Sequence, residues 1–242
     1  MPYGNEEDKM KIMTFNTQHC LNFLEKKIDY QIMADLISGE GADICGLNEM
    51  YSNRIEGDDL PNQTKILSEL SGLTNYYFAK AICLDGEGSY GNGFISKIPI
   101  LSAETIIIPD PNPRKYNGYY ETRCLLKAKL VGGITVLVCH FGLNPDEQGN
   151  AVKTILENLE SEKCILMGDF NVTPDNPVLN PIRERMKDAS VGFCQSSPTF
   201  PSDKPKIKID YIFVSKDIDV KFAEIPEKIA SDHRVHTAVV DL

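Results

Sequence analysis

The stretch KCILMGDFNVTP at residues 163–174 combines the two features that recur along the chain and decide its fold. Its apolar run at 163–170 has the length and composition of a buried strand. Polar side chains, Asp169 and Asn171, come where that run ends. Other apolar runs meet polar residues in the same way: Asn16 after KIMTF, Glu49 at the end of ADICGLNE, His140 after TVLVC, Asp210 at the start of DYIFVS, and Asp232 and His233 just before VHTAVVDL.

These polar residues at strand ends predict one shared site, because strand ends in a protein of two packed sheets converge at one edge. Carboxylates such as Glu49 and Asp169 are hard oxygen ligands that suit Mg²⁺ or Mn²⁺. His140 and His233 offer imidazoles for phosphate contact and proton transfer. An all-oxygen metal site with two histidines suits phosphoester hydrolysis. Each residue taken alone also has a structural explanation, such as an exposed strand end or a capped turn.

Short strands dominate the rest of the chain. We expect them at residues 11–15, 42–49, 75–82, 93–96, 100–108, 123–130, 134–140, 163–170, 209–215 and 235–242. Helical spacing of apolar residues predicts helices over 28–40, 61–71 and 146–160, and the Gly132–Gly133 pair predicts a hairpin turn. Many short strands with few helices favour two sheets packed face to face with helices outside. No linker divides the chain, so we expect one domain.

Two segments, 83–93 and 109–120, are predicted to be long loops that shape a binding site. Residues 83–93 are rich in glycine and residues 109–120 in proline, and each segment carries at least one tyrosine. We expect substrate choice to depend on residues in these loops. The candidates are Tyr90, Asn92, Arg114, Tyr116 and Tyr119.

Composition limits the binding partners and the cellular compartment that we expect for this chain. The 242 residues include 25 lysines and arginines against 35 aspartates and glutamates, a net charge of −10. Strong non-specific binding of nucleic acid is therefore not expected. No run of 18 apolar residues predicts a membrane span, and the first residues show no secretory signal. Seven cysteines without a CxxC pair predict buried, reduced thiols. We expect a cytoplasmic protein and a monomer.

Nine stretches of the chain, in this order, resemble the endonuclease/exonuclease/phosphatase family, whose members are similar to deoxyribonuclease I. They are TFNTQ, GLNEM, GNGFISKIPI, ETRCLL, VCHFGL, GDFNVTP, PTFP, KIDYIF and SDHRV. The resemblance implies an α/β (α+β) fold, a four-layer α/β/β/α sandwich of two packed mixed sheets with outer helices. One domain would span 11–242, after an N-terminal extension at 1–10. The resemblance also implies a divalent-metal-dependent phosphoesterase that uses Mg²⁺ or Mn²⁺.

The same resemblance assigns the metal and the water. It implies that Glu49 is the principal metal ligand, with Asn16 beside it and Asp232 as a second carboxylate on the metal side. Asp169 resembles the residue that positions or deprotonates the attacking water. Asn171 resembles the neighbouring residue that binds the scissile phosphate.

The remaining roles concern acid catalysis and phosphate binding. His233 resembles the catalytic histidine, and Asp210 the carboxylate that orients it and favours its charged form. A cationic His233 can then stabilise the transition state or protonate the leaving group. His140 matches a second histidine that only some branches of the family carry, and Arg123 matches an arginine on the phosphate side.

Some residues depart from the pattern of the family or of its DNA-repair branch. Asn48 stands where glutamine often precedes the metal-binding glutamate, and Gln18 stands where that branch usually has aspartate. We therefore predict a phosphodiesterase or phosphatase that acts on a small or lipid-like phosphoester by in-line water attack. A DNA or RNA nuclease is the first alternative. A non-catalytic scaffold with the same fold is the second.

Overall fold

A computed structural model describes residues 9–52, 62–84 and 88–242 and contains two six-stranded sheets. The first sheet has the order β13 (Asp219–Glu224), β14 (His236–Asp241), β1 (Lys9–Asn16), β4 (Ile44–Ser52), β6 (Gly88–Ser96), β5 (Asn75–Leu84). The second has the order β11 (Met186–Asp188), β12 (Asp210–Ser215), β10 (Cys164–Asp169), β9 (Thr135–His140), β8 (Cys124–Leu130), β7 (Ile100–Ile107). A short hairpin joins β2 (Leu21–Asn22) to β3 (Lys27–Ile28).

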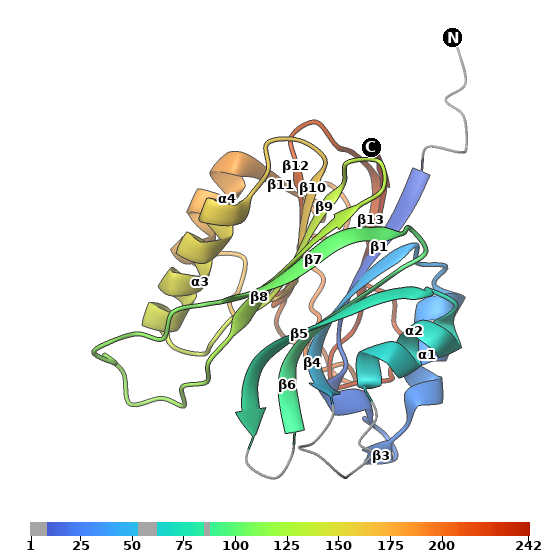
Figure 1. Cartoon of the computed structure of the whole chain (residues 1–242), viewed down its shortest axis with the longest axis horizontal. Helices are drawn as coiled ribbons and strands as arrows, with labels where there is room; N and C mark the ends of the chain where they lie inside the picture. Colours follow the sequence, from blue (N-terminus) through green and yellow to red (C-terminus); the bar gives the residue numbers. More distant parts are fainter. Residues whose placement is uncertain (1–8, 53–61, 85–87) are drawn as a thin grey trace.

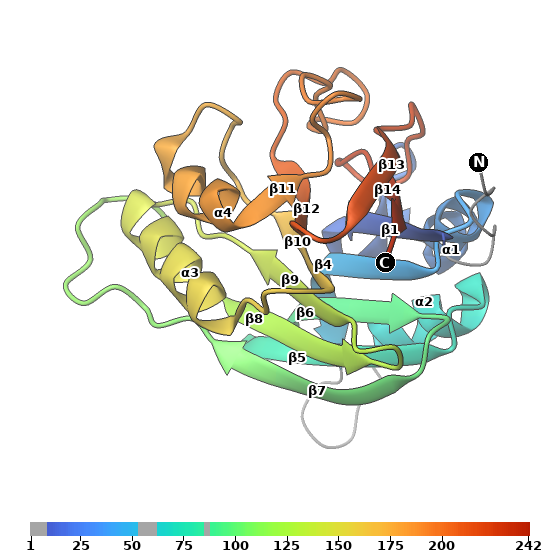
Figure 2. The same ribbon diagram turned by 90° about the horizontal axis from the view of Figure 1, so that it is seen from above.

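Helices cover the outer face of each sheet (Figures 1 and 2). On the first sheet lie α1 (Tyr30–Gly39) and α2 (Gln63–Ser71), and on the second lie α3 (Pro145–Asn158) and α4 (Asn180–Arg185). Three apolar cores separate the four layers: one between the sheets and one under each helix pair. Each fully buried aliphatic side chain in them stabilises the fold by roughly 1.5–3 kcal/mol. The predicted four-layer sandwich of two packed sheets is confirmed.

Local sequence explains where the helices begin and where the chain reverses. The Asp29 side chain accepts hydrogen bonds from the backbone N–H groups of Gln31 and Ile32 and so caps α1. Helix α3 begins with a capping box formed by Asn144 and Glu147. The Gly132–Gly133 turn has positive φ at both residues, as a tight hairpin requires, and confirms the predicted turn between β8 and β9.

The middle of each sheet brings the polar strand ends together. Strands β1 and β4 run parallel, which places Asn16 opposite Asn48. Strands β9 and β10 also run parallel, so that Asp169 lies opposite His140, and antiparallel β12 places Asp210 on its other side. The two sheets pack closely here. A Cβ added at Gly46 of the first sheet would lie 2.6 Å from the Met167 sulfur of the second.

Three predictions about local structure need correction. Most of the segment 83–93 is not a loop, because β5 continues to Leu84 and β6 begins at Gly88; residues 85–87 lie outside the described part. Glycines concealed this strand. Gly91 pairs so closely with β5 that a Cβ would lie 2.0 Å from the Ala79 carbonyl oxygen. Strand β1 begins at Lys9, two residues before the start of the strand predicted at 11–15, and pairs with β14 from there. Short elements, namely β11, β13 and α4, were missed.

Other predictions agree with the structure. The segment 109–120 contains no helix or strand. Six of the seven cysteines are buried, while Cys83 is exposed. Within the described residues, no helix is both long and apolar enough to cross a membrane.

Candidate active site

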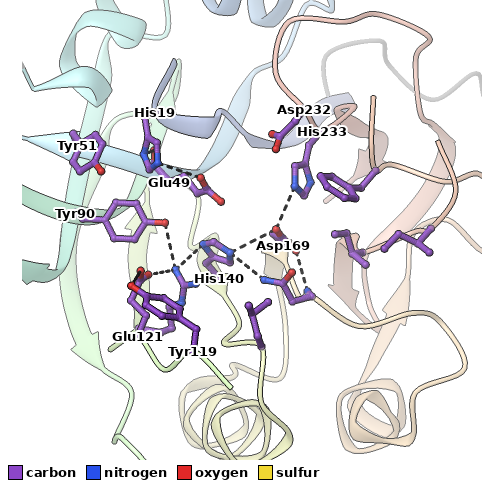
Figure 3. Close-up of a pocket in the computed structure, with 16 residues that line it drawn as sticks. His19, Glu49, Tyr51, Tyr90, Tyr119, Glu121, His140, Asp169, Asp232 and His233 are labelled. Carbon is purple, nitrogen blue, oxygen red and sulfur yellow. Dashed lines mark hydrogen bonds and ion pairs between the residues drawn. The ribbon is translucent and has the colours of Figure 1, made fainter. Parts of the chain in front are cut away.

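A cleft of about 650 Å³ opens where the strand ends of the two sheets converge (Figure 3). Carboxylates and imidazoles form its floor, among them Glu49, Asp169, His140 and His233. Aromatic rings line one side, and the apolar side chains of Phe200, Ile207 and Ile209 line the other. The cleft therefore has a polar floor between two differently built walls.

Asp169 lies at the centre of the floor with its side chain 2% exposed. Its Oδ1 accepts a hydrogen bond from the backbone N–H of Asn171 at 2.9 Å. Its Oδ2 faces three groups: Asn16 Nδ2 at 3.1 Å, His140 Nε2 at 3.6 Å and His233 Nε2 at 3.7 Å. Burial raises the pKa of Asp169; the nearby charge of His233 opposes this and that of Asp210 adds to it. A carboxylate with a raised pKa is well suited to accept a proton from water.

A hydrogen bond to the buried Asp210 carboxylate holds His233 in place. Its Nδ1 lies 2.9 Å from Asp210 Oδ2, and its ring packs 4.8 Å, centroid to centroid, from Phe200. Burial opposes a charge on His233, but the carboxylates of Asp210, Asp169 and Asp232 outweigh it and raise its pKa to about 10. The protonated imidazole that the sequence predicts is therefore the form present at neutral pH.

His140 is neutral instead. Burial, with the charges of Arg123 and His233, holds its pKa well below the ordinary range. Arg123 Nη1 lies 3.1 Å from His140 Nδ1. Arg123 and the Asn171 amide nitrogen both only donate, and they face opposite ring nitrogens. The charged Arg123 is the stronger donor and takes the lone pair on Nδ1, which assigns the proton to Nε2, the nitrogen that faces Asp169. Arg123 also forms an ion pair with Glu121, which leaves a nearly buried cation beside the floor.

Asn171 follows Asp169 with a φ of 50°, a left-handed conformation that asparagine tolerates. Its Nδ2 donates to the Phe141 carbonyl oxygen at 3.1 Å and lies 3.2 Å from His140 Nε2. This conformation turns the Asn171 amide to line the cleft. Asn171 and Arg123 thus both line the cleft and flank the His140 ring, one at each nitrogen.

Glu49 is placed by an irregularity in β4. The pairing register between β4 and β6 shifts between Leu47 and Met50, and Glu49 has a φ of 60°. Bulges of this kind re-aim a side chain next to active sites. The Glu49 carboxylate remains 22% exposed at the cleft. Asn16 Nδ2 donates to its Oε1 at 3.0 Å, while the Asn16 oxygen accepts from the Gln18 backbone. In this arrangement Asn16 orients Glu49 rather than presenting an oxygen to the cleft.

The donor set fits a divalent metal on the side of Glu49. Glu49 and Asp232 both line the cleft, and both are only partly buried. Carboxylates of this kind suit Mg²⁺ or Mn²⁺. Asp169, Asp210 and His233 also gather potential ligand atoms within 4.8 Å of one another. In that group, however, His233 Nδ1 and Asp210 Oδ2 already hydrogen-bond to each other, so the open carboxylates provide the better site.

Three predicted substrate residues lie elsewhere. Arg114 is exposed in its loop, 4.7 Å from the centroid of the Tyr120 ring, and is absent from the described lining of the cleft. Asn92 is buried beneath the cleft, where its oxygen accepts from Asn48 Nδ2 at 2.8 Å and its Nδ2 donates to the Cys124 carbonyl at 2.9 Å. Tyr116 is exposed in its loop and is absent from the described lining of the cleft. These side chains therefore do not line the cleft, where contacts with substrate were predicted. Tyr90 and Tyr119 do line the cleft.

Several residues that line the cleft were not predicted, above all His19, Tyr51 and Glu121. His19 follows Asn16 by three residues and so shares its position after a strand, which is a usable signal. Glu121 comes two residues before Arg123, the spacing that places both side chains on one side of an extended chain. Tyr51 continues β4 beyond the bulge, and nothing in the sequence distinguishes it from a surface tyrosine.

The model of the endonuclease/exonuclease/phosphatase family matches this chain over residues 13–233. The chain belongs to this family. Members of the family are hydrolases that act on phosphoester bonds, and they are generally dependent on divalent metals. A comparison with curated proteins finds no match.

Solved structures share the fold. A family protein from Beutenbergia cavernae has a TM-score of 0.82 at 20% identity, covering 97% of this chain and 72% of that one. The mannosyl-6-phosphatase Bt3783 of Bacteroides thetaiotaomicron has a TM-score of 0.73 at 16% identity, covering 96% and 100%. TDP2 of D. rerio, solved with a single-stranded DNA product, has a TM-score of 0.67 at 15% identity, covering 97% and 99%. At these identities the likeness shows the fold alone.

Proposed function

We propose that the chain hydrolyses a small phosphoester by in-line attack of water, with Mg²⁺ or Mn²⁺ held at Glu49 and Asp232. The observation that carries the proposal is the position of Asp169. It lies between a cationic His233 and a neutral His140, with Glu49 tied to it through the Asn16 amide. A water activator, an acid and a metal ligand therefore meet in one cleft.

Each described side chain then has a distinct role. Glu49 and Asp232 would hold the divalent ion, which would supply Lewis-acid polarisation of a phosphoryl oxygen. Asp169 accepts the proton of the attacking water, and His233 stabilises the charge that develops on the phosphoryl group or protonates the leaving oxygen. Asn171 and Arg123 donate to the phosphate. Asn16 holds the Glu49 and Asp169 carboxylates at a fixed separation.

Charge favours a small substrate over a nucleic acid. Among the described residues that line the cleft, Arg123 is the one lysine or arginine, and Glu121 already pairs with it. Proteins that bind nucleic acid tightly neutralise several phosphates with lysine and arginine. The apolar wall at Phe200, Ile207 and Ile209 supports a substrate with an apolar portion beyond its phosphate. A nuclease is the weaker candidate for these reasons.

The test is hydrolysis of bis(p-nitrophenyl) phosphate, p-nitrophenyl phosphate and a single-stranded oligonucleotide with Mg²⁺, with Mn²⁺ and with EDTA. We expect metal-dependent release of nitrophenol that EDTA stops and His233→Ala abolishes. Oligonucleotide cleavage with a kcat/KM above that of both nitrophenyl esters would favour the nuclease instead. Activity in His233→Ala equal to that of the wild type would contradict the assignment of the site.

A further inference from the structure

His19 lies on the open side of the cleft, beside Glu49 (Figure 3). It belongs to the 3₁₀ turn Gln18–Cys20, whose three residues have positive φ values of 47°, 58° and 62°. Non-glycine residues adopt this conformation at a cost, and such strain concentrates at functional sites. Five of the seven described non-glycine residues with positive φ lie at this cleft or in this turn: Gln18, His19, Cys20, Glu49 and Asn171.

Several contacts hold the strained turn and fix the imidazole. The Gln18 backbone N–H donates to Asn16 Oδ1 at 3.0 Å, and Gln63 Nε2 donates to the His19 carbonyl at 2.9 Å. The ring packs on Tyr51 with a centroid separation of 4.4 Å and lies 5.5 Å from the Tyr90 centroid. The His19 side chain is therefore positioned by its surroundings, although 32% of it remains exposed.

The hydrogen bond at Nδ1 determines what the other ring nitrogen offers. His19 Nδ1 lies 3.2 Å from the Glu49 carbonyl oxygen. A carbonyl only accepts, so Nδ1 carries the proton and the neutral ring has a lone pair on Nε2. That Nε2 lies 3.6 Å from Glu49 Oε2. Histidines that ligate metals almost always donate their other ring N–H to a carbonyl or carboxylate in this way.

We propose that His19 Nε2 is a ligand of the divalent ion held by Glu49, an inference that rests on the proposed function. A single ion with bonds of roughly 2.0–2.2 Å to nitrogen and oxygen spans the 3.6 Å between the two atoms. The metal site then contains a nitrogen donor and is not the all-oxygen site that the sequence predicts. A nitrogen donor favours Mn²⁺, Co²⁺ or Zn²⁺ relative to Mg²⁺, which prefers oxygen ligands.

Electron spin-echo envelope modulation of Mn²⁺ bound to the intact chain tests this directly. We expect ¹⁴N modulation from a coordinated imidazole in the wild type and in His140→Asn, and its loss in His19→Asn. Asparagine suits position 19 because it tolerates a positive φ and is too short to replace the imidazole. Calorimetry should show the Mn²⁺ affinity of His19→Asn reduced by at least about tenfold, because loss of an outer-shell partner alone costs about 10–100-fold. The Mg²⁺ affinity should fall less.

The outcomes separate the two proposals. Mn²⁺ that binds without nitrogen modulation, or modulation that persists in His19→Asn, would overturn this inference and leave the proposed function standing. A wild-type chain that binds no divalent ion would overturn both. Circular dichroism checks that the variants fold. If His19→Asn does not fold, the other histidine variants decide. Retention of the ¹⁴N modulation in both His140→Asn and His233→Asn assigns the modulation to His19, because the fourth histidine, His236, is fully buried outside the cleft.

Discussion

The two sides of the cleft differ in burial. The acid–base side consists of Asp169, Asp210, His233 and His140, whose side chains are 1–6% exposed and contact one another. The metal side consists of Glu49, Asp232 and His19, and the side chains of Glu49 and His19 are 22% and 32% exposed. Both sides come from residues at strand ends, so topology alone does not distinguish them.

In the proposed mechanism, this difference lets one site combine proton transfer with ion exchange. Burial on the acid–base side lets neighbouring charges shift pKa values in opposite directions, upward at His233 and downward at His140. Such opposite shifts are what assign an acid and a neutral donor to two residues of the same type. The open metal side leaves room for an ion and its water to enter.

Removing the central carboxylate of the acid–base side should abolish turnover in a way that metal cannot restore. Asp169→Asn should lower kcat by about 10²–10⁴-fold, the usual contribution of a positioned base. Initial rates at increasing Mn²⁺ measure this. Asp175→Asn, at an exposed aspartate, is the matched control and should retain activity. Recovery of Asp169→Asn at high Mn²⁺ would place Asp169 on the metal side instead.

The buried amides beneath the cleft should matter for stability. Asn48 accepts from the Asp169 backbone N–H at 2.9 Å and donates to Asn92 and to the Cys139 carbonyl, so it joins the two sheets. Asn48→Ala leaves those partners unsatisfied and should lower the free energy of unfolding by about 1–3 kcal/mol for each. Asn92→Ala should also destabilise the fold without raising KM. Urea denaturation and Michaelis–Menten kinetics measure the two effects. A raised KM with unchanged stability would return Asn92 to substrate binding.

Stability of the metal-free chain should fall as the pH drops from about 6 to 5, a range in which His233, with its raised pKa, is protonated in the folded chain and mostly protonated in the unfolded chain. Burial holds the pKa values of His140 and His236 well below the ordinary 6.5, so over this range the unfolded chain binds protons there that the folded chain does not. Asp169, with its raised pKa, binds one proton in the folded chain and offsets one of these histidines. The net loss is up to about 1.4 kcal/mol per pH unit, measured by urea denaturation at each pH. Stability that rises as the pH falls over this range would contradict the neutral, buried state of these histidines.

We expect the smallest effect from a substitution at a residue that belongs to neither side of the cleft. Tyr116 is 47% exposed and contributes its backbone N–H to the Tyr120 hydroxyl, a bond that does not need the Tyr116 side chain. Tyr116→Ala should change stability by less than about 0.5 kcal/mol and leave KM unchanged. Tyr119→Ala, at a residue that does line the cleft, is the comparison and should raise KM. Equal effects of the two substitutions would show that the whole loop contacts substrate.

The sequence predicted the buried side better than the open side. Asp169, Asp210 and His140 lie on or directly after strands whose apolar runs are unmistakable, so both the fold and their convergence follow from the pattern. Glu49 was predicted from its place at a strand end, but the orientation of Glu49 and His19 depends on left-handed backbone and a bulge, which residue patterns do not reveal. Asn92 was mistaken for a loop residue because the glycines beside it concealed strand β6, in which its buried side chain hydrogen-bonds to Asn48. Tertiary contacts, not local propensity, decide such positions.

The most direct measurement is the restoration of phosphodiesterase activity by Mn²⁺ in chain stripped with EDTA, compared with Glu49→Gln. The account predicts that wild-type activity is lost on stripping and returns with half-saturation at the Mn²⁺ dissociation constant found by calorimetry. In Glu49→Gln both values should shift together to higher Mn²⁺. Activity that survives stripping, or that returns in Glu49→Gln at the wild-type concentration of Mn²⁺, would contradict a metal-dependent phosphoesterase with its ion at Glu49.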